Sequence, residues 1–124
     1  MKISRRFLHG AAFALLAGPV TAHHSGAMFD DKKTVTLTGT VKAFQWTNPH
    51  CWIQVVVPSQ DGPVEWSVEM GAPFEVVRTG LRPTSLKAGD KITVIINPIR
   101  DGSHGGLYVS ATGADGKPIS RTAE

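Results

Sequence analysis

The stretch from Val35 to Val57 constrains the fold more than any other part of the sequence. Its first half alternates small or apolar residues with threonines and a lysine, a period of two that predicts a half-buried strand over 35–46. Residues 47–49, Thr-Asn-Pro, interrupt the pattern, and an apolar run from Cys51 to Val57 predicts a second strand. We therefore expect two consecutive strands joined by a short break that ends at His50. The apolar face of the first strand comprises Val35, Leu37, Gly39, Val41 and Ala43.

The remaining sequence predicts three more strands and one short helix. A turn over 59–62, with Asp-Gly as its signal, precedes a third strand over 64–70. Pro73 opens a helix of about two turns that Gly80 ends, and further strands follow over 91–96 and 107–112. Gly39 predicts a bulge or a sharp coil in the first strand. This order predicts an all-β, OB-fold-like five-stranded barrel with its helix between strands three and four. A small open sandwich is the alternative, and we prefer the barrel because closure removes exposed strand edges.

Residues 1–22 have the composition of a cleaved export signal. Three basic residues precede an apolar segment over 7–17, and Val20 and Ala22 suit a signal-peptidase site. The apolar segment is shorter than the roughly 20 residues of a spanning helix, so we expect no stable membrane span after cleavage. Residues 4–8, Ser-Arg-Arg-Phe-Leu, are similar to a twin-arginine signal, with general secretory export as the alternative. We therefore expect a periplasmic or secreted protein, with an N-terminal segment over 23–34, a barrel domain over 35–112 and a polar, fraying tail over 113–124.

The charge of the mature chain argues against nucleic acid as a partner. The whole sequence carries 13 Lys and Arg against 10 Asp and Glu, but Lys2, Arg5 and Arg6 belong to the leader. Ten residues of each sign then remain, and no basic patch is left to neutralise phosphates. The single cysteine excludes an internal disulfide, so a modest core must provide the stability.

Histidines supply the sharpest candidate site. If cleavage follows Ala22, His23 offers a free α-amine and an imidazole to one metal ion, and both groups are largely available near neutral pH. Nitrogen ligands in a planar arrangement suit copper(II), and an imidazole from His50 would complete a histidine brace. His24 is a further candidate ligand. The alternatives are that the terminal histidines are solvated and that His50 packs at the barrel rim.

Weaker candidates surround this set. Cys51 is either a soft metal ligand or a small buried hydrophobe. His104 lies in a glycine-rich loop, and it is either part of a loop that closes over a site or a lone histidine without such a role. Glu65 and Glu69 alternate with apolar residues, and we expect them on a solvated face.

Aromatic side chains define a second possible surface. Trp46 and Trp52 flank the break between the first two strands, and aromatics on the face of an OB barrel stack on ligands. Simple packing under the loops is the alternative for both rings.

The sequence as a whole resembles a family of small exported bacterial proteins that is classed as domain of unknown function 6152. The resemblance covers nearly the whole mature chain and rests on six short segments: 22–25 (Ala-His-His-Ser), 29–30 (Phe-Asp), 37–41 (Leu-Thr-Gly-Thr-Val), 47–50 (Thr-Asn-Pro-His), 65–69 (Glu-Trp-Ser-Val-Glu) and 86–90 (Leu-Lys-Ala-Gly-Asp). Cys51 is not part of that pattern. The resemblance implies an exported single domain and supplies no substrate or catalytic residue.

Three functions are therefore open. The leading hypothesis is a periplasmic binding protein that holds a transition metal, copper first, without catalytic turnover. The second is a metal-free OB-like module that binds a periplasmic protein or glycan partner through Trp46, Trp52 and the rim loops. The third is an oxidative copper enzyme, for which the sequence identifies no substrate surface.

Overall fold

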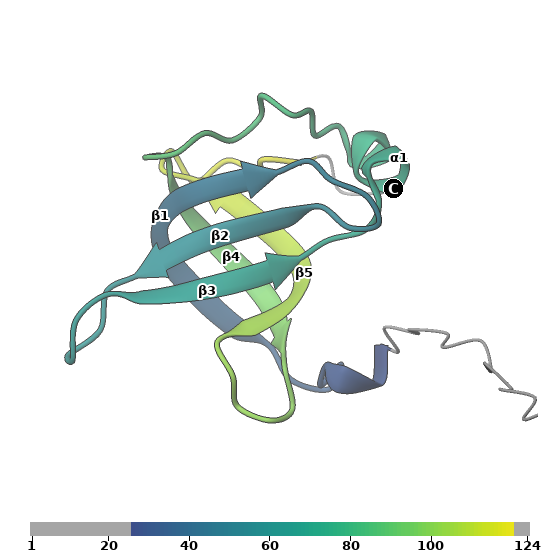
Figure 1. Ribbon diagram of the computed structural model, residues 1–124. Coiled ribbons are helices and arrows are strands. Elements are labelled where there is room, and N and C mark those ends of the chain that lie inside the picture. Colours follow the sequence, from purple (N-terminus) through teal and green to yellow (C-terminus); the bar gives the residue numbers. More distant parts are fainter. Residues whose placement is uncertain (1–25, 121–124) are drawn as a thin grey trace, which may run out of the picture.

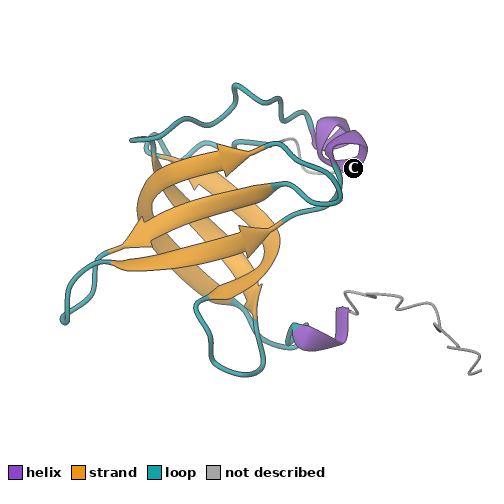
Figure 2. Cartoon of the chain, viewed as in Figure 1, coloured by secondary structure: helices purple, strands orange, loops and turns teal. Residues whose placement is uncertain are grey.

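The computed structural model describes residues 26–120, which form one barrel with short helical turns at its ends (Figures 1 and 2). The strands are β1 (Val35–Gln45), β2 (Trp52–Val57), β3 (Val64–Glu69), β4 (Lys91–Pro98) and β5 (Gly105–Gly113). The helical elements are η1 (Gly26–Met28), α1 (Pro73–Val76) and η2 (Val77–Thr79). Each predicted strand is present, and β4 and β5 extend by one or two residues beyond their predicted ends.

The five strands close in the order β1-β2-β3-β5-β4, which confirms the predicted barrel. β3 pairs with β5 in parallel, and the other four pairings are antiparallel. The β2–β3 hairpin turns at Ser59–Gly62, where the Gly62 N–H donates to the Ser59 carbonyl and Gly62 has a φ of 104°. This turn sets a register that pairs Val57 with Val64 and Trp52 with Glu69.

β1 is the longest strand and pairs with a different partner along each half. Its first half pairs with β4 and its second half with β2, so the strand must coil between them. At Gly39 the coil brings the backbones of β1 and β2 so close that a Cβ atom would collide with the Val56 carbonyl oxygen. The predicted irregularity therefore exists, but the bulge itself lies between Val41 and Ala43.

The prediction that Ala43 lies on the apolar face of β1 is wrong because of this bulge. The extra residue at Lys42 shifts the alternation by one position, since side chains in a strand switch faces at every residue. Phe44 instead of Ala43 then packs against the core, opposite the buried Ile53. Ala43 pairs with Gln54 on the outer face.

The core fills the barrel interior with aliphatic side chains from all five strands. The second strand, for which the sequence allowed two faces, buries Cys51, Ile53 and Val55 at 0% exposure. The helical turns close the barrel end through Val76 and Leu81, and Gly80 ends them in a left-handed conformation as predicted. The Glu75 carboxylate accepts the Ala72 N–H at 2.8 Å at the start of α1. None of the helices within residues 26–120 has the length and apolar character needed to cross a bilayer.

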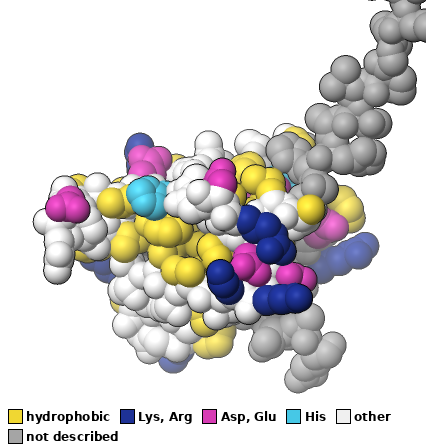
Figure 3. Space-filling view, turned by 90° about the horizontal axis from the view of Figure 1, so that it is seen from below, with side chains coloured by type: hydrophobic (Ala, Val, Ile, Leu, Met, Phe, Trp, Pro, Cys, Tyr) yellow, Lys and Arg dark blue, Asp and Glu magenta, His cyan; other side chains and the backbone are white. Residues whose placement is uncertain are grey.

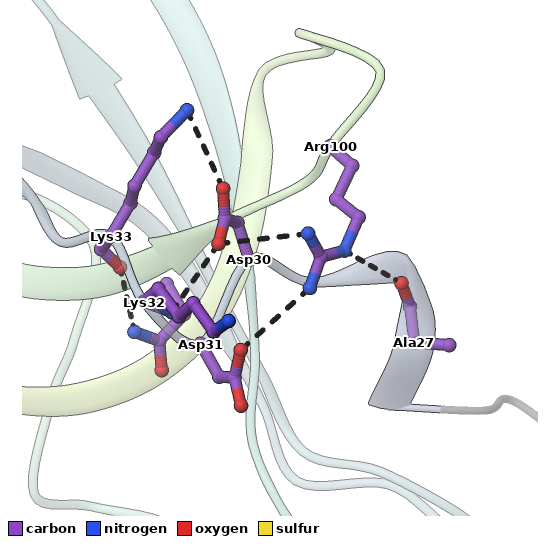
Figure 4. A network of polar contacts seen from close by, with 7 residues as sticks. Ala27, Asp30, Asp31, Lys32, Lys33 and Arg100 are labelled. Atoms are coloured by element: carbon purple, nitrogen blue, oxygen red, sulfur yellow. Dashed lines mark hydrogen bonds and ion pairs between the residues drawn. The ribbon is translucent and has the colours of Figure 1, made fainter.

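The segment before β1 is tied to the barrel and is not a loose linker (Figure 4). Phe29 is buried and forms a bridge with Ile99. Arg100 donates from Nε to the Ala27 carbonyl at 3.0 Å and approaches Asp30 at 3.6 Å and Asp31 at 3.7 Å. These contacts anchor the N-terminal segment to the start of the β4–β5 loop.

The C-terminal segment also differs from the prediction of a fraying tail. Residues 113–120 fold back on β5, where Ile119 donates its N–H to the Ala111 carbonyl and packs against the core. Tyr108 and Ser120 share a hydroxyl hydrogen bond of 3.2 Å. Burial of the ring raises the pKa of Tyr108. The apolar Ile119 explains the difference, because it gives an otherwise polar segment a place in the core.

Candidate functional site

Of the histidines predicted as metal ligands, His50 lies in the β1–β2 loop and against the end of β3. Thr47 donates from its hydroxyl to the His50 carbonyl at 2.8 Å, and the Asn48–Pro49 peptide bond is cis. The next residue, Cys51, exchanges backbone hydrogen bonds with Met70 and Gly71, which continues the β2–β3 pairing beyond the strand ends. Hydrogen bonds at Thr47 and at Cys51 therefore hold the backbone around His50. Figure 1 shows this loop at the same end of the barrel as α1.

The imidazole of His50 is oriented by two oxygen atoms. Its Nδ1 lies 3.0 Å from the Met70 carbonyl oxygen and 3.4 Å from Oε1 of Glu69. Because a carbonyl oxygen only accepts hydrogen bonds, Nδ1 must carry the proton. In the neutral ring this tautomer places the lone pair on Nε2. A histidine that donates one ring N–H to a carbonyl or carboxylate is the usual arrangement of a metal ligand, although it also suits a structural histidine.

Glu69 is the part of this site that sequence reasoning missed. We expected it on a solvated face with Glu65, but Glu69 is only 5% exposed and is the only charged residue buried within 26–120. It points outward from the barrel as predicted, yet it stands at the end of β3 between Trp52 on β2 and Leu107 on β5. Its carboxylate approaches the His50 ring, with Oε1 3.4 Å from Nδ1. Burial of a carboxylate is costly without a partner, so we expect the His50 ring to stabilise Glu69.

Cys51 belongs to the core and not to the His50 site. Its side chain has 0% exposure and lies on the inner face with Ile53 and Val55. Burial raises the pKa of its thiol, which a backbone hydrogen bond at Thr47 lowers in part. A metal ion could reach this sulfur only by displacing core side chains. The placement favours the interpretation of Cys51 as a small buried hydrophobe.

The described residues alone do not assemble a metal centre. Within residues 26–120, no three His, Cys, Asp or Glu side chains converge on one point. His23 and His24, the other predicted ligands, lie outside the described residues. A metal site at His50 would therefore need donors from that part of the chain.

The tryptophans predicted as a ligand surface separate in the structure. Trp46 packs against the core and meets Phe44 edge-on, with ring centroids 5.7 Å apart. Trp52 lies on the outer face of β2 and pairs across the sheet with both Gln45 and Glu69. Only Trp52 thus remains on the outer sheet face.

A row of hydrogen-bonded side chains crosses the same outer face. Gln54 donates to Gln45 at 2.9 Å and accepts from the Ser67 hydroxyl at 2.6 Å, so the row spans β1, β2 and β3. Next to it, Lys42 and Glu65 form an ion pair of 2.6 Å. The outer face beside Trp52 is therefore polar, and its described lysine is paired.

His104 lies in another loop. Its ring packs against Trp66 at an interplanar angle of 45°, with centroids 4.9 Å apart, and its carbonyl accepts the Ser67 N–H. The β4–β5 loop that carries it lies beside the N-terminal segment, whereas His50 contacts the end of β3 near α1 (Figure 1). The described contacts of the two histidines share no side chain. Figure 3 shows a histidine against hydrophobic side chains on the face seen from below, with Lys, Arg, Asp and Glu side chains intermixed elsewhere on that face.

Comparison with known proteins supports the fold and leaves the activity open. The barrel is similar to the mitochondrial single-stranded DNA-binding protein Rim1 of S. cerevisiae, with a TM-score of 0.50 and 8% sequence identity over 66% of this chain and 93% of that chain. This likeness confirms the OB-type fold and carries no functional argument at such low identity. A search of curated proteins finds no match to the sequence. A family model described as "Family of unknown function (DUF6152)" matches residues 12–110.

Proposed function

Since the chain belongs to the family of unknown function DUF6152, we propose its function from the site itself: an exported binding domain that holds a transition metal, copper first. The proposed ligands are the α-amine and imidazole of His23 together with Nε2 of His50, with His24 in reserve. The proposal assigns no catalytic turnover. Its location, in the periplasm or outside the cell, follows from the composition of residues 1–22.

The observation that carries the proposal is the orientation of the His50 ring. The Met70 carbonyl at 3.0 Å fixes the Nδ1–H tautomer, and the buried Glu69 carboxylate at 3.4 Å reinforces it. Outer partners of this kind fix the ring orientation and raise the basicity of the ligating nitrogen. Both oxygen atoms belong to the end of β3, so the rigid barrel and not a flexible loop supports the ring.

The chemistry of the proposed donors selects the metal. An amine and two imidazoles give three nitrogen ligands, and a planar nitrogen set favours copper(II) over calcium or magnesium, which prefer oxygen. The Cys51 sulfur takes no part in this site, because Cys51 faces the core. The affinity for copper should depend on pH, because a protonated amine or imidazolium must lose its proton before its nitrogen can bind the ion.

The test is a copper(II) titration of the purified mature protein, whose N-terminus is first confirmed by sequencing. We expect one equivalent to bind with a nitrogen-dominated electron paramagnetic resonance spectrum. His23→Ala and a variant with one residue added before His23 should each lose this binding, because each removes part of the chelate. His50→Ala should weaken it, while His104→Ala provides a matched control on another loop.

The proposal fails if the added residue leaves both affinity and spectrum unchanged, because the amine is then not a ligand. It also fails if His104→Ala and His50→Ala reduce the affinity equally. Loss of copper binding in the His50 variant is interpreted only if the thermal melt of that variant matches the wild type.

A second candidate function rests on the outer face of β1, β2 and β3. Trp52 lies there beside the Gln45–Gln54–Ser67 row, an aromatic ring next to amide and hydroxyl groups. We propose that this face, if the protein is metal-free, binds a glycan or protein partner and not nucleic acid. The reason is charge: the one described lysine on this part of the face is paired with Glu65, and phosphate backbones require unpaired cations.

The second candidate is tested with Trp52→Ala and soluble peptidoglycan fragments. We expect the fragments to quench tryptophan fluorescence in the wild-type protein and not in the variant. Trp46→Phe serves as the control because that ring packs on the core. Equal quenching in the wild type and in Trp52→Ala would exclude this surface.

A further inference from the structure

A hollow on the described part of the molecule lies away from His50. It has a volume of about 520 Å³ and lies against the outer faces of β1, β4 and β5. Pro58 of the β2–β3 hairpin forms one wall, and the turn from Gly113 to Gly116 forms another. Cavities of this size accept small organic ligands. Neither the family nor the metal proposal assigns a role to this surface.

The strand register places four threonines in this hollow. Thr38, Thr93 and Thr112 form one row across β1, β4 and β5, because Thr38 pairs with Thr93 and Thr93 pairs with Thr112. The next pair on the same face is Thr40 and Lys91. All five side chains alternate with buried residues of their strands, such as Leu37, Val94 and Ala111, and therefore point outward.

The polar groups of the hollow have hydrogen atoms to donate. Lys91 donates from Nζ to the Thr40 hydroxyl at 2.6 Å, which leaves the Thr40 proton and two ammonium protons for other acceptors. The hydroxyls of Thr38 and Thr93 share one hydrogen bond of 3.0 Å, so one of the two hydroxyl protons remains. A surface rich in donors is complementary to a ligand rich in acceptor oxygens.

The charge of the lining also favours a ligand rich in acceptor oxygens. Lys91 is the only charged residue among the lining residues, and it forms no ion pair with a carboxylate of residues 26–120. Its sequence neighbour Asp90 is bound to Lys87 instead, at 2.9 Å. Asp115, beside the wall, accepts the Lys117 N–H at 3.0 Å. Neighbouring carboxylates therefore have partners other than the Lys91 ammonium group.

We propose that this hollow is a binding site for a small oxyanion-bearing ligand, a carboxylate or a phosphate, with Lys91 as its charged anchor. The ammonium group and the Thr40, Thr93 and Thr112 hydroxyls bind the oxyanion. The walls formed by Pro58 and Ala114 contact the rest of the ligand. The site is independent of the proposed metal centre, because none of its lining residues belongs to that centre.

The test is a two-dimensional amide NMR titration of the mature protein with citrate, with inorganic phosphate and with neutral glucose. Ionic strength is held constant so that screening does not change between points. We expect saturable shifts from citrate or phosphate that are largest at the amides of Thr38, Thr93, Thr112 and Gly113. Saturation by both anions identifies the oxyanion group as the determinant, and saturation by citrate alone identifies a carboxylate ligand.

Three variants complete the test. Lys91→Gln should weaken anion binding about tenfold or more, the usual effect of losing a hydrogen bond to a charged group. Lys91→Arg should largely retain the affinity, and Lys32→Gln, which removes an exposed lysine elsewhere, should leave it unchanged. The proposal is overturned if Lys91→Gln binds as the wild type does, if glucose saturates the same amides, or if the shifts scatter over all lysine-rich surfaces.

Discussion

Glu69 and His50 show how one contact can give a site its character. Glu69 is 5% exposed, and Oε1 of its carboxylate approaches the Nδ1 of His50 at 3.4 Å. Glu65 lies four residues earlier on β3. It has the same side chain, but it is exposed and pairs with Lys42. The two glutamates thus differ in environment and not in sequence context, which makes them a matched pair for mutation.

The first prediction uses this pair. Glu69→Gln keeps the shape of the side chain and removes the charge next to His50. Because outer partners of metal-bound histidines typically contribute 10- to 100-fold to affinity, we expect copper(II) binding to weaken by about tenfold. Glu65→Gln should leave the affinity unchanged. Competition with a chromophoric copper chelator measures both, and an equal affinity for Glu69→Gln and the wild type would separate Glu69 from any metal site.

The second prediction concerns the pH dependence that Cys51 gives to stability. Burial raises the pKa of its thiol above the usual value, so the folded chain retains a proton that the unfolded chain releases. Stability from this proton is present below the unfolded pKa and is lost as pH rises above it. The free energy of unfolding should therefore fall between about pH 8 and pH 10, and Cys51→Ala should remove part of that fall.

Urea denaturation at several pH values measures this effect. At pH 7, Cys51→Ala should cost about 1 kcal/mol because it removes a fully buried sulfur. Tyr108 has its pKa raised in the same direction by burial, and Tyr108→Phe identifies its share. A stability difference between wild type and Cys51→Ala that stays constant up to pH 10 contradicts the prediction. A thiol reagent that labels the folded protein as fast as the unfolded one would contradict the burial itself.

At the scale of elements, the N-terminal segment packs against the barrel and is hydrogen-bonded to it. Phe29 is 5% exposed and bridges Ile99, and Arg100 holds the segment through Ala27, Asp30 and Asp31 (Figure 4). The domain therefore begins before β1, which the strand pattern alone did not indicate. One buried aromatic residue in a polar stretch is enough to anchor it.

The third prediction tests that anchor with two phenylalanines. Phe29→Ala should lower the free energy of unfolding by about 3 kcal/mol, the usual cost of truncating a buried aromatic side chain. Phe74→Ala, at a position 62% exposed on α1, should change it by less than about 0.5 kcal/mol. Chemical denaturation of both variants provides the comparison, and equal effects would show that the segment does not contribute to the core.

At the scale of the whole molecule, the balanced charge of the chain without its proposed leader leads us to predict that the barrel does not bind nucleic acid. The chain without Lys2, Arg5 and Arg6 carries equal numbers of basic and acidic residues. Several of the basic groups are paired, including Lys42 with Glu65 and Arg100 with Asp30. The structural likeness to a single-stranded DNA-binding protein, at 8% sequence identity, shows the fold alone.

The fourth prediction follows from that balance. A fluorescent 15-base oligothymidine should show no saturable binding to the mature protein at about 0.1 M salt, because few cations are available to release counterions. Anisotropy measured at low and at physiological salt checks this. Saturable binding with a steep salt dependence would instead assign the outer sheet face to single-stranded nucleic acid.

The sequence by itself determined the succession of strands along the chain, the position of the helix and the family. Alternation, the Asp-Gly turn and Pro73 are local signals, and each fixes a local backbone conformation without long-range information. The turn over 59–62 even contains the register, since pairing residues symmetrically about it places Trp52 opposite Glu69 and Cys51 opposite Met70. The pairing of Glu69 with Trp52 was the one signal in the sequence that could have identified Glu69 as part of the site.

Only the tertiary structure decided which groups meet. The bulge at Lys42 reversed the face of Ala43, because one extra residue shifts every side chain after it. Glu69 became buried because a loop histidine and a neighbouring strand, both distant in sequence, cover the end of β3. The threonine row beside Lys91 likewise required β1, β4 and β5 to come into register. Burial and juxtaposition depend on contacts between distant segments, and no local pattern encodes those contacts.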